Sequence, residues 1–181
     1  AGDVLVLTKP IGSGVLFNAN LKNWVSSSAM DDCIQILLTL NKTAAEIIQD
    51  LEVHSVTDVT GFGLAGHGLE MARGSGVTLE FDFERLPLMA EALAMYRKGM
   101  NTGVNAYNRQ LVSDHTQTLK HLPRWHEEII YDPQTSGGLL VSQPETQANA
   151  LCSALGQKEA PPAAIIGRVR PYDGKSHLIF R

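Results

Sequence analysis

TDVTGFGLAGHG, residues 57–68, is the most informative stretch of this chain. Gly61, Gly63 and Gly66 satisfy the pattern GxGxxG, which in dinucleotide-binding domains follows a strand and opens a helix. A short strand candidate, residues 53–56, precedes the segment, and a predicted helix over residues 64–73 follows it. The segment therefore predicts a strand, a polar glycine-rich turn and a helix, in that order.

A dinucleotide site is one interpretation of this pattern, but two features disfavour it. The strand before the first glycine is normally apolar, whereas Ser55, Thr57, Asp58 and Thr60 crowd that junction here. At the same junction, Asp58 would place a negative charge beside a pyrophosphate, with nothing evident to offset it. The second feature is that only nine residues separate Gly66 from Gly76, which leaves a cramped helix. Acidic residues that could bind a ribose do follow within residues 80–84, so the alternative stays open.

Asp58 fits better as a magnesium ligand. Magnesium commonly lies between one or two carboxylates and the phosphates of a substrate, and it keeps several waters. The residues that flank Asp58 are the candidates for the phosphate side, because glycines let a backbone approach closely: Thr57, Thr60, Gly61 and Gly63. The alternative is an Asp that caps the following helix or turns the loop, and spacing alone does not separate the two.

A second segment of interest is DPQTSGG, residues 132–138. A glycine pair before an apolar strand can let another chain or a ligand approach. A plain turn explains the same pattern, so the pattern by itself is weak. The candidates for a loop that lines a cleft are Gln134, Thr135, Ser136, Gly137 and Gly138.

Outside these two segments, apolar patterning predicts alternating strands and helices within a single domain, residues 1–181. The connections vary in length, which favours an α+β fold with a mixed β-sheet layered with α-helices over a regular parallel wind. The expected strands are residues 4–7, 53–56, 77–83, 129–131, 139–142, 163–169 and 177–180. The expected helices are residues 29–51, 64–73, 88–97 and 145–155, the first with a capping box from Ser28 to Asp31. Residues 11–14 and 99–108 are expected as a turn and a loop, and residues 110–128 show poor periodicity.

Composition excludes several classes of protein. With 44% hydrophobic and 19% charged residues, the chain can bury a core and is not a disordered tail. A net charge of −4, with Lys and Arg scattered, argues against a nucleic-acid binder. The apolar stretches are far shorter than the roughly 20 residues that a membrane span needs. Neither the cysteines nor the histidines show metal-site spacing, and His67 is expected as a packed or capping residue. We expect a soluble cytoplasmic protein without membrane or nucleic-acid partners.

Four segments together resemble the C-terminal half of selenophosphate synthetases (selenide, water dikinases). They are GDVLVLTKPIGSGVL at residues 2–16, TDVTGFGLAGH at residues 57–67, DPQTSGGLL at residues 132–140 and AAIIGRV at residues 163–169. Their order and separations match, so the resemblance covers nearly the whole chain. TDVTGFG alone points only to the wider superfamily of aminoimidazole ribonucleotide synthetase. TKPIGSGVL and DPQTSGGLL together narrow the resemblance to the selenophosphate synthetases within that superfamily.

The resemblance implies the fold of the C-terminal domain of that superfamily and a reaction in which selenide, ATP and water give selenophosphate, AMP and phosphate with Mg²⁺. It implies an ATP cleft shared with an N-terminal domain, and a homodimer built mainly through that domain. The catalytic Cys or selenocysteine and Lys of the family belong to the N-terminal domain, so none is expected in this chain. Asp58 matches the family's one magnesium-binding Asp in this half. In the loop of residues 101–105, Thr102 and Asn105 match the family, whereas Gly103 and Val104 replace a charged pair. Asn105 is therefore a further candidate for the phosphate side.

Two alternatives remain open beside this resemblance. One is another enzyme of the superfamily that acts on a different phosphate acceptor. The other is a non-catalytic binding or dimerisation module. The chain opens on a strand-like segment, which suggests that further sequence lies upstream. A Cys or selenocysteine followed shortly by Lys in that upstream sequence would favour the synthetase.

Overall fold

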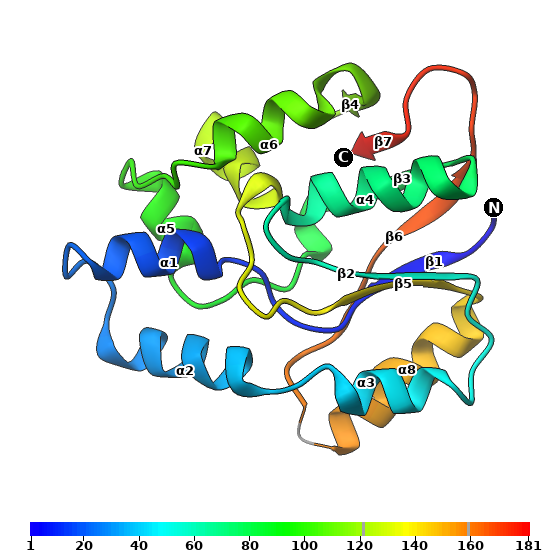
Figure 1. Cartoon of the computed structure of the whole chain (residues 1–181), viewed down its shortest axis with the longest axis horizontal. Coiled ribbons are helices and arrows are strands. Elements are labelled where there is room, and N and C mark those ends of the chain that lie inside the picture. The colour runs from blue at the N-terminus through cyan, green and yellow to red at the C-terminus, as the bar shows by residue number, and fades with distance from the viewer. Residues whose placement is uncertain (121, 159) are drawn as a thin grey trace.

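The computed structural model describes residues 1–120, 122–158 and 160–181, and these form a mixed sheet with helices on both faces (Figure 1). The strand order is β2-β5-β1-β6-β3-β7-β4. The strands are β1 (Val4–Leu7), β2 (Ser55–Asp58), β3 (Val77–Phe81), β4 (Thr116–Thr118), β5 (Leu139–Gln143), β6 (Ala164–Pro171) and β7 (Leu178–Phe180). β7 pairs in parallel with β3 and β4, and the other pairs are antiparallel. The predicted α+β class with a mixed sheet is confirmed.

The helices divide between the two faces of the sheet. Those of the described residues are α1 (Ser13–Asn20), α2 (Ser27–Leu38), α3 (Lys42–Ile48), α4 (Gly63–Ser75), α5 (Ala92–Arg97), α6 (Asn105–Val112), α7 (Arg124–Glu127) and α8 (Glu145–Gln157). Short 3₁₀-helices are η1 (Phe83–Arg85), η2 (Ser113–His115) and η3 (Glu128–Tyr131). Figure 1 shows α3 and α8 on the opposite side of β1, β2 and β5 from α4.

Strand alternation explains why there are two cores. Leu5 and Leu7 of β1 belong to the larger core, which includes Leu64 of α4. Val6, between them, belongs to the smaller core, which includes Leu151 of α8. Successive side chains of a strand point to opposite faces, so one short apolar strand anchors both helical layers.

The predicted helix over residues 29–51 is wrong, because it is broken into α2 and α3. Thr39, at the break, has extended backbone angles, and its carbonyl accepts a hydrogen bond from Lys9 Nζ at 2.5 Å instead of continuing the helix. The helix also begins earlier than predicted. Ser26 is the N-cap, and its hydroxyl accepts the amide of Ala29 at 3.2 Å, so the predicted capping box from Ser28 is wrong too.

Three other local predictions are wrong. Residues 129–131 lie in η3 and not in a strand. Ser13 and Gly14, predicted within a turn, begin α1. The predicted loop over residues 99–108 already contains the first turn of α6, where the Thr102 hydroxyl accepts the amide of Asn105 at 3.2 Å. In each case the decisive partner is a side chain or a distant segment, which local periodicity does not report.

The described residues contain neither a membrane-spanning helix nor a metal-binding cluster of three or more side chains. None of their helices has both the length and the apolar character that crossing a membrane requires. They hold no group of three or more His, Cys, Asp or Glu side chains arranged to bind a metal ion by themselves. His121 lies outside the described residues.

Candidate functional site

Asp58 is the last residue of β2, which is an edge strand, and it pairs with Leu139 of β5. Its side chain is exposed, and no donor among the described residues contacts its carboxylate. The neighbouring Thr57 hydroxyl donates only to the backbone carbonyl of Asp58, at 3.4 Å. α4 begins at Gly63 without a side-chain cap, so Asp58 does not serve as the helix cap that the sequence left open. Its carboxylate is therefore available to a ligand.

The two glycine-rich segments predicted as candidates lie side by side. The amide of Val59 donates to the carbonyl of Gly138 at 2.9 Å, and the amide of Gln134 donates to the carbonyl of Thr60 at 3.0 Å. A Cβ on Gly137 would lie 2.0 Å from the carbonyl oxygen of Val59. The glycine at this position is thus required for the contact between the loops, which brings residues 57–63 and 134–138 together.

A third segment, residues 8–14, completes the junction. The side-chain carbonyl of Gln134 accepts the amides of Gly12 and Ser13 at 3.0 and 3.3 Å. The Ser13 hydroxyl accepts the amide of Thr135 at 3.0 Å. Gln134 is only 5% exposed, so it joins the segments and offers little surface to a ligand. Thr135 is exposed and stays a candidate for the cleft.

Asp132 is the buried centre of this junction, and we did not select it from the sequence. Its carboxylate accepts the amides of Gly14 and Val15 at 3.0 and 2.8 Å, which caps the N-terminus of α1. It also accepts from the Tyr96 hydroxyl at 2.5 Å and from Gln134 Nε2 at 2.8 Å. Burial raises the pKa of Asp132 to about 6, although these hydrogen bonds act in the opposite direction. The signal that sequence could have offered is its place at the head of DPQTSGG.

Lys9 is a second residue that the sequence reasoning missed. It is 3% exposed, and its ammonium donates to the carbonyls of Ser136 and Thr39 at 2.8 and 2.5 Å. Among the described residues no carboxylate lies within ion-pair distance of it, and burial lowers its pKa. Ser136 has a φ of 48°, a left-handed conformation that is uncommon for a residue other than glycine. Lys9 therefore holds an exposed, conformationally constrained turn in place.

Asn105, predicted on the phosphate side, is fully buried. Its side-chain amide donates to the Tyr96 hydroxyl and to a Glu128 carboxylate oxygen, each at 2.9 Å. Since Tyr96 in turn donates to Asp132, Asn105 supports the junction from inside. Asn105 is 0% exposed, so it presents no accessible atom to a ligand in this structure.

The donor set fits a magnesium ion only in part. Asp58 supplies one free carboxylate, and among the described residues no group of three or more His, Cys, Asp or Glu side chains could hold a metal ion by itself. Magnesium prefers oxygen ligands in an octahedral shell and usually retains water and substrate phosphates. Gly61 is exposed and open, because a Cβ there would meet nothing within 4 Å, so its backbone can be approached. The residues present therefore suit one wall of a magnesium site.

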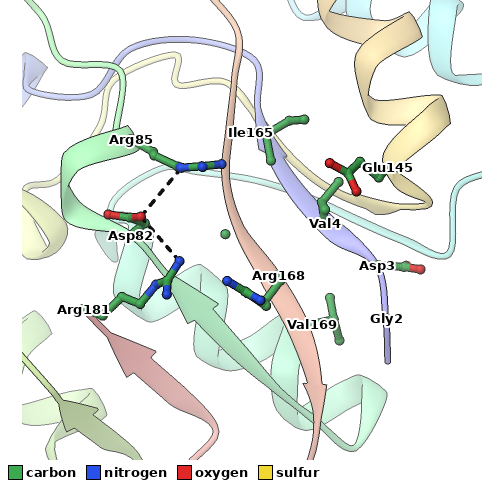
Figure 2. Close-up of a pocket in the computed structure, with 11 residues that line it drawn as sticks. Gly2, Asp3, Val4, Asp82, Arg85, Glu145, Ile165, Arg168, Val169 and Arg181 are labelled. Atoms are coloured by element: carbon green, nitrogen blue, oxygen red, sulfur yellow. Dashed lines mark ion pairs between the residues drawn. The ribbon is translucent and has the colours of Figure 1, made fainter.

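A hollow of about 440 Å³ lies elsewhere, at the Val4 end of β1 (Figure 2). Arg85 and Arg181 line it, and each contacts Asp82 at 3.6 Å, as the dashed lines of Figure 2 show. Arg168, which also lines it, contacts the buried carboxylate of Glu80 at 3.3 Å. The predicted candidates lie at the opposite end of β1, so this hollow is separate from them.

The chain matches a known protein family over almost its whole length. Residues 1–178 match the family described as AIR synthase related protein, C-terminal domain. This chain is 40% identical over 179 residues to selenide, water dikinase 2 of Peptoclostridium acidaminophilum. The alignment covers 99% of this chain and 51% of the relative. The chain is 41% identical over 174 residues to selenide, water dikinase of Clostridioides difficile (strain 630), covering 96% and 50%. The chain thus spans about half the length of the curated relatives it matches.

Solved structures with the same fold are more distant in sequence. The hydrogenase maturation protein HypE in complex with ATP aligns with a TM-score of 0.67 at 17% identity, covering 99% of this chain and 47% of that one. Thiamine monophosphate kinase from Aquifex aeolicus aligns with a TM-score of 0.62 at 20% identity, covering 99% and 49%. At these identities the likeness concerns the fold alone.

Proposed function

Because this chain belongs to the family of AIR synthase related C-terminal domains, with selenide, water dikinases among its relatives, we propose that it forms one wall of a magnesium-ATP cleft. The longer polypeptide of which it would be the C-terminal half is called the parent protein below. We propose that the parent protein is a selenide, water dikinase, which uses ATP to convert selenide into selenophosphate.

The observation that carries this proposal is the free carboxylate of Asp58, where the segments of residues 57–63 and 134–138 meet. An exposed acid without a protein partner, beside glycines that leave the backbone open, is the arrangement that a phosphate-bound magnesium ion needs. Magnesium, when bound there, would neutralise negative charge on the ATP phosphates.

The chain's own residues have separate tasks in this proposal. Asp58 would supply one ligand to the ion, and the exposed backbone at Gly61 would let the phosphates approach. Asp132 and Lys9 contact no ligand, since both are buried. They hold the loop of residues 134–138 in position against α1 and the α2–α3 junction. The other carboxylates for magnesium, and the Cys or selenocysteine and Lys of the family, would come from the N-terminal domain. We therefore propose that the isolated chain is inactive.

The test is an assay of the parent protein and of this chain alone. With the parent protein, ATP consumption should require selenide and Mg²⁺, and ³¹P NMR should detect selenophosphate. The isolated chain should show neither. If the parent protein consumes ATP at the same rate without selenide, the result would favour another enzyme of the superfamily. The absence of both ATP binding and turnover would favour a binding or dimerisation module.

A further inference from the structure

Three side chains form a hydrogen-bonded row that runs from the glycine-rich loop onto α4. The Thr60 hydroxyl oxygen lies 3.0 Å from His67 Nε2, and His67 Nδ1 lies 3.0 Å from a carboxylate oxygen of Glu70. The His67 side chain is 10% exposed, whereas that of Glu70 is 60% exposed. The buried imidazole of His67 therefore lies between the hydroxyl of Thr60, two residues after Asp58, and the exposed carboxylate of Glu70.

The acid determines which hydrogens the other two groups carry. An ionised carboxylate only accepts hydrogen bonds, so the contact with Glu70 requires a hydrogen on His67 Nδ1. In a neutral imidazole the other nitrogen, Nε2, then has a lone pair and must accept. The Thr60 hydroxyl consequently donates its single hydrogen to Nε2, and its oxygen keeps only lone pairs for any further partner.

The backbone of Thr60 is held as firmly as its side chain. Its carbonyl accepts the amides of Gly63 and Gln134, each at 3.0 Å. The half-buried Thr60 hydroxyl therefore presents an acceptor from a fixed position. Phosphate oxygens are themselves acceptors and need donors, whereas a cation, or a water bound to it, needs lone pairs.

We propose that Glu70 and His67 are positioning residues that fix the Thr60 hydroxyl as an acceptor for the magnesium ion or one of its waters. This inference rests on the proposed magnesium-ATP site. It moves Thr60 from the phosphate side, where the sequence placed it, to the metal side. Removal of a partner that orients a metal-site group typically weakens metal binding 10- to 100-fold.

The tautomer can be tested on the isolated chain without ligands. In ¹⁵N NMR spectra recorded at a pH high enough to keep the imidazole neutral, His67 should show a protonated Nδ1 and an unprotonated Nε2. Glu70→Ala should produce a mixture of tautomers, because Nδ1 loses its acceptor. A hydrogen on Nε2 in the wild-type chain would overturn the proposal, since the Thr60 oxygen would then accept from the ring.

The metal role is tested by Mn²⁺ binding to the parent protein with ATP, read by electron paramagnetic resonance. Glu70→Ala should weaken Mn²⁺ binding by ~10-fold. The control is Glu46→Ala, because Glu46 is also a helical glutamate with a 60% exposed side chain and lies on α3. Thr60→Ser should retain binding, whereas Thr60→Val should lose as much as Glu70→Ala or more.

Two failures are distinguishable in this experiment. Equal Mn²⁺ binding in Glu70→Ala and Glu46→Ala would overturn the role of the row and leave the proposed function standing. Absence of Mn²⁺ binding to the wild-type parent protein would overturn both. A purely structural row would lower the melting temperature of Glu70→Ala without changing its Mn²⁺ affinity relative to the control, and that result also counts against the proposal.

Discussion

Gly137 approaches Val59 so closely that a Cβ on Gly137 would lie 2.0 Å from the Val59 carbonyl oxygen. The contact joins the loop after Asp58 to the loop before β5, and the adjacent hydrogen bond from the Val59 amide to the Gly138 carbonyl reinforces it. Because the opposing atom belongs to the backbone, it cannot rotate away as a side chain would. The geometry of the candidate site therefore depends on the absence of a side chain at residue 137.

Gly137→Ala should lower the free energy of unfolding by about 2 kcal/mol or more, since overpacking against fixed atoms typically costs 1–3 kcal/mol. For a chain of this length, that corresponds to a fall of about 4–8 °C in melting temperature. Gly61→Ala is the matched control, because a Cβ there meets nothing within 4 Å, and its stability should change by less than about 1 kcal/mol. Calorimetry of both variants checks this, and equal melting temperatures would contradict it.

Asp132 should titrate well above an ordinary aspartate, because burial raises its pKa from 3.8 to about 6. Its carboxyl carbon should shift in ¹³C NMR with a midpoint near pH 6. The folded state then binds the proton more tightly than the unfolded chain does, so this group's stabilising contribution is complete below about pH 4. That contribution is lost as the pH rises through 6. A midpoint at or below 3.8 would show that the hydrogen bonds outweigh burial.

Where local pattern and tertiary context agree, the sequence predicted the fold well. The strand at residues 4–7 has the predicted bounds, and the helix predicted over residues 145–155 is observed as Glu145–Gln157. Both are indicated by apolar patterning and by a nearby proline, Pro10 shortly after the strand and Pro144 directly before the helix. Such elements need no information from distant residues.

Two of the elements that were predicted wrongly have carbonyls that accept hydrogen bonds from distant side chains. The break between α2 and α3 lies at Thr39, whose carbonyl is bound by Lys9. Residues 128–131 do not form a strand, and the carbonyls of Glu128 and Tyr131 accept the side-chain amides of Asn105 and Asn108. A partner 23 to 30 residues away leaves no mark on a window of local periodicity.

In the candidate site too, some residues could be predicted from the sequence and others could not. Asp58 could be selected because a polar residue at a strand end beside glycines is visible in the sequence itself. Asp132 and Lys9 could not, because their roles appear only when folding brings α1 and the α2–α3 junction onto the loop at Ser136. The chain's resemblance to a family located the loops, but the structure identified what holds them.

Magnesium-ATP should bind the isolated chain weakly. One carboxylate leaves most of the octahedral shell to water and phosphate, and magnesium releases water reluctantly. Titration calorimetry should therefore give a dissociation constant well above 1 µM, the value that corresponds to about −8 kcal/mol. Any residual heat that depends on Mg²⁺ should disappear in Asp58→Asn. Micromolar affinity would mean that this half contains more of the site than we propose.

Asp58→Asn in the parent protein is the most direct test of the proposed role of Asp58. Asn retains the shape and one acceptor oxygen, so a merely structural Asp58 would lose about 1 kcal/mol or less and keep its activity. A magnesium ligand would lose its negative charge and with it the stabilisation of the phosphoryl-transfer transition state. We predict an unchanged melting temperature and a loss of selenide-dependent ATP consumption to background. Wild-type turnover by Asp58→Asn at ordinary Mg²⁺ concentration would contradict the role that we assign to this residue.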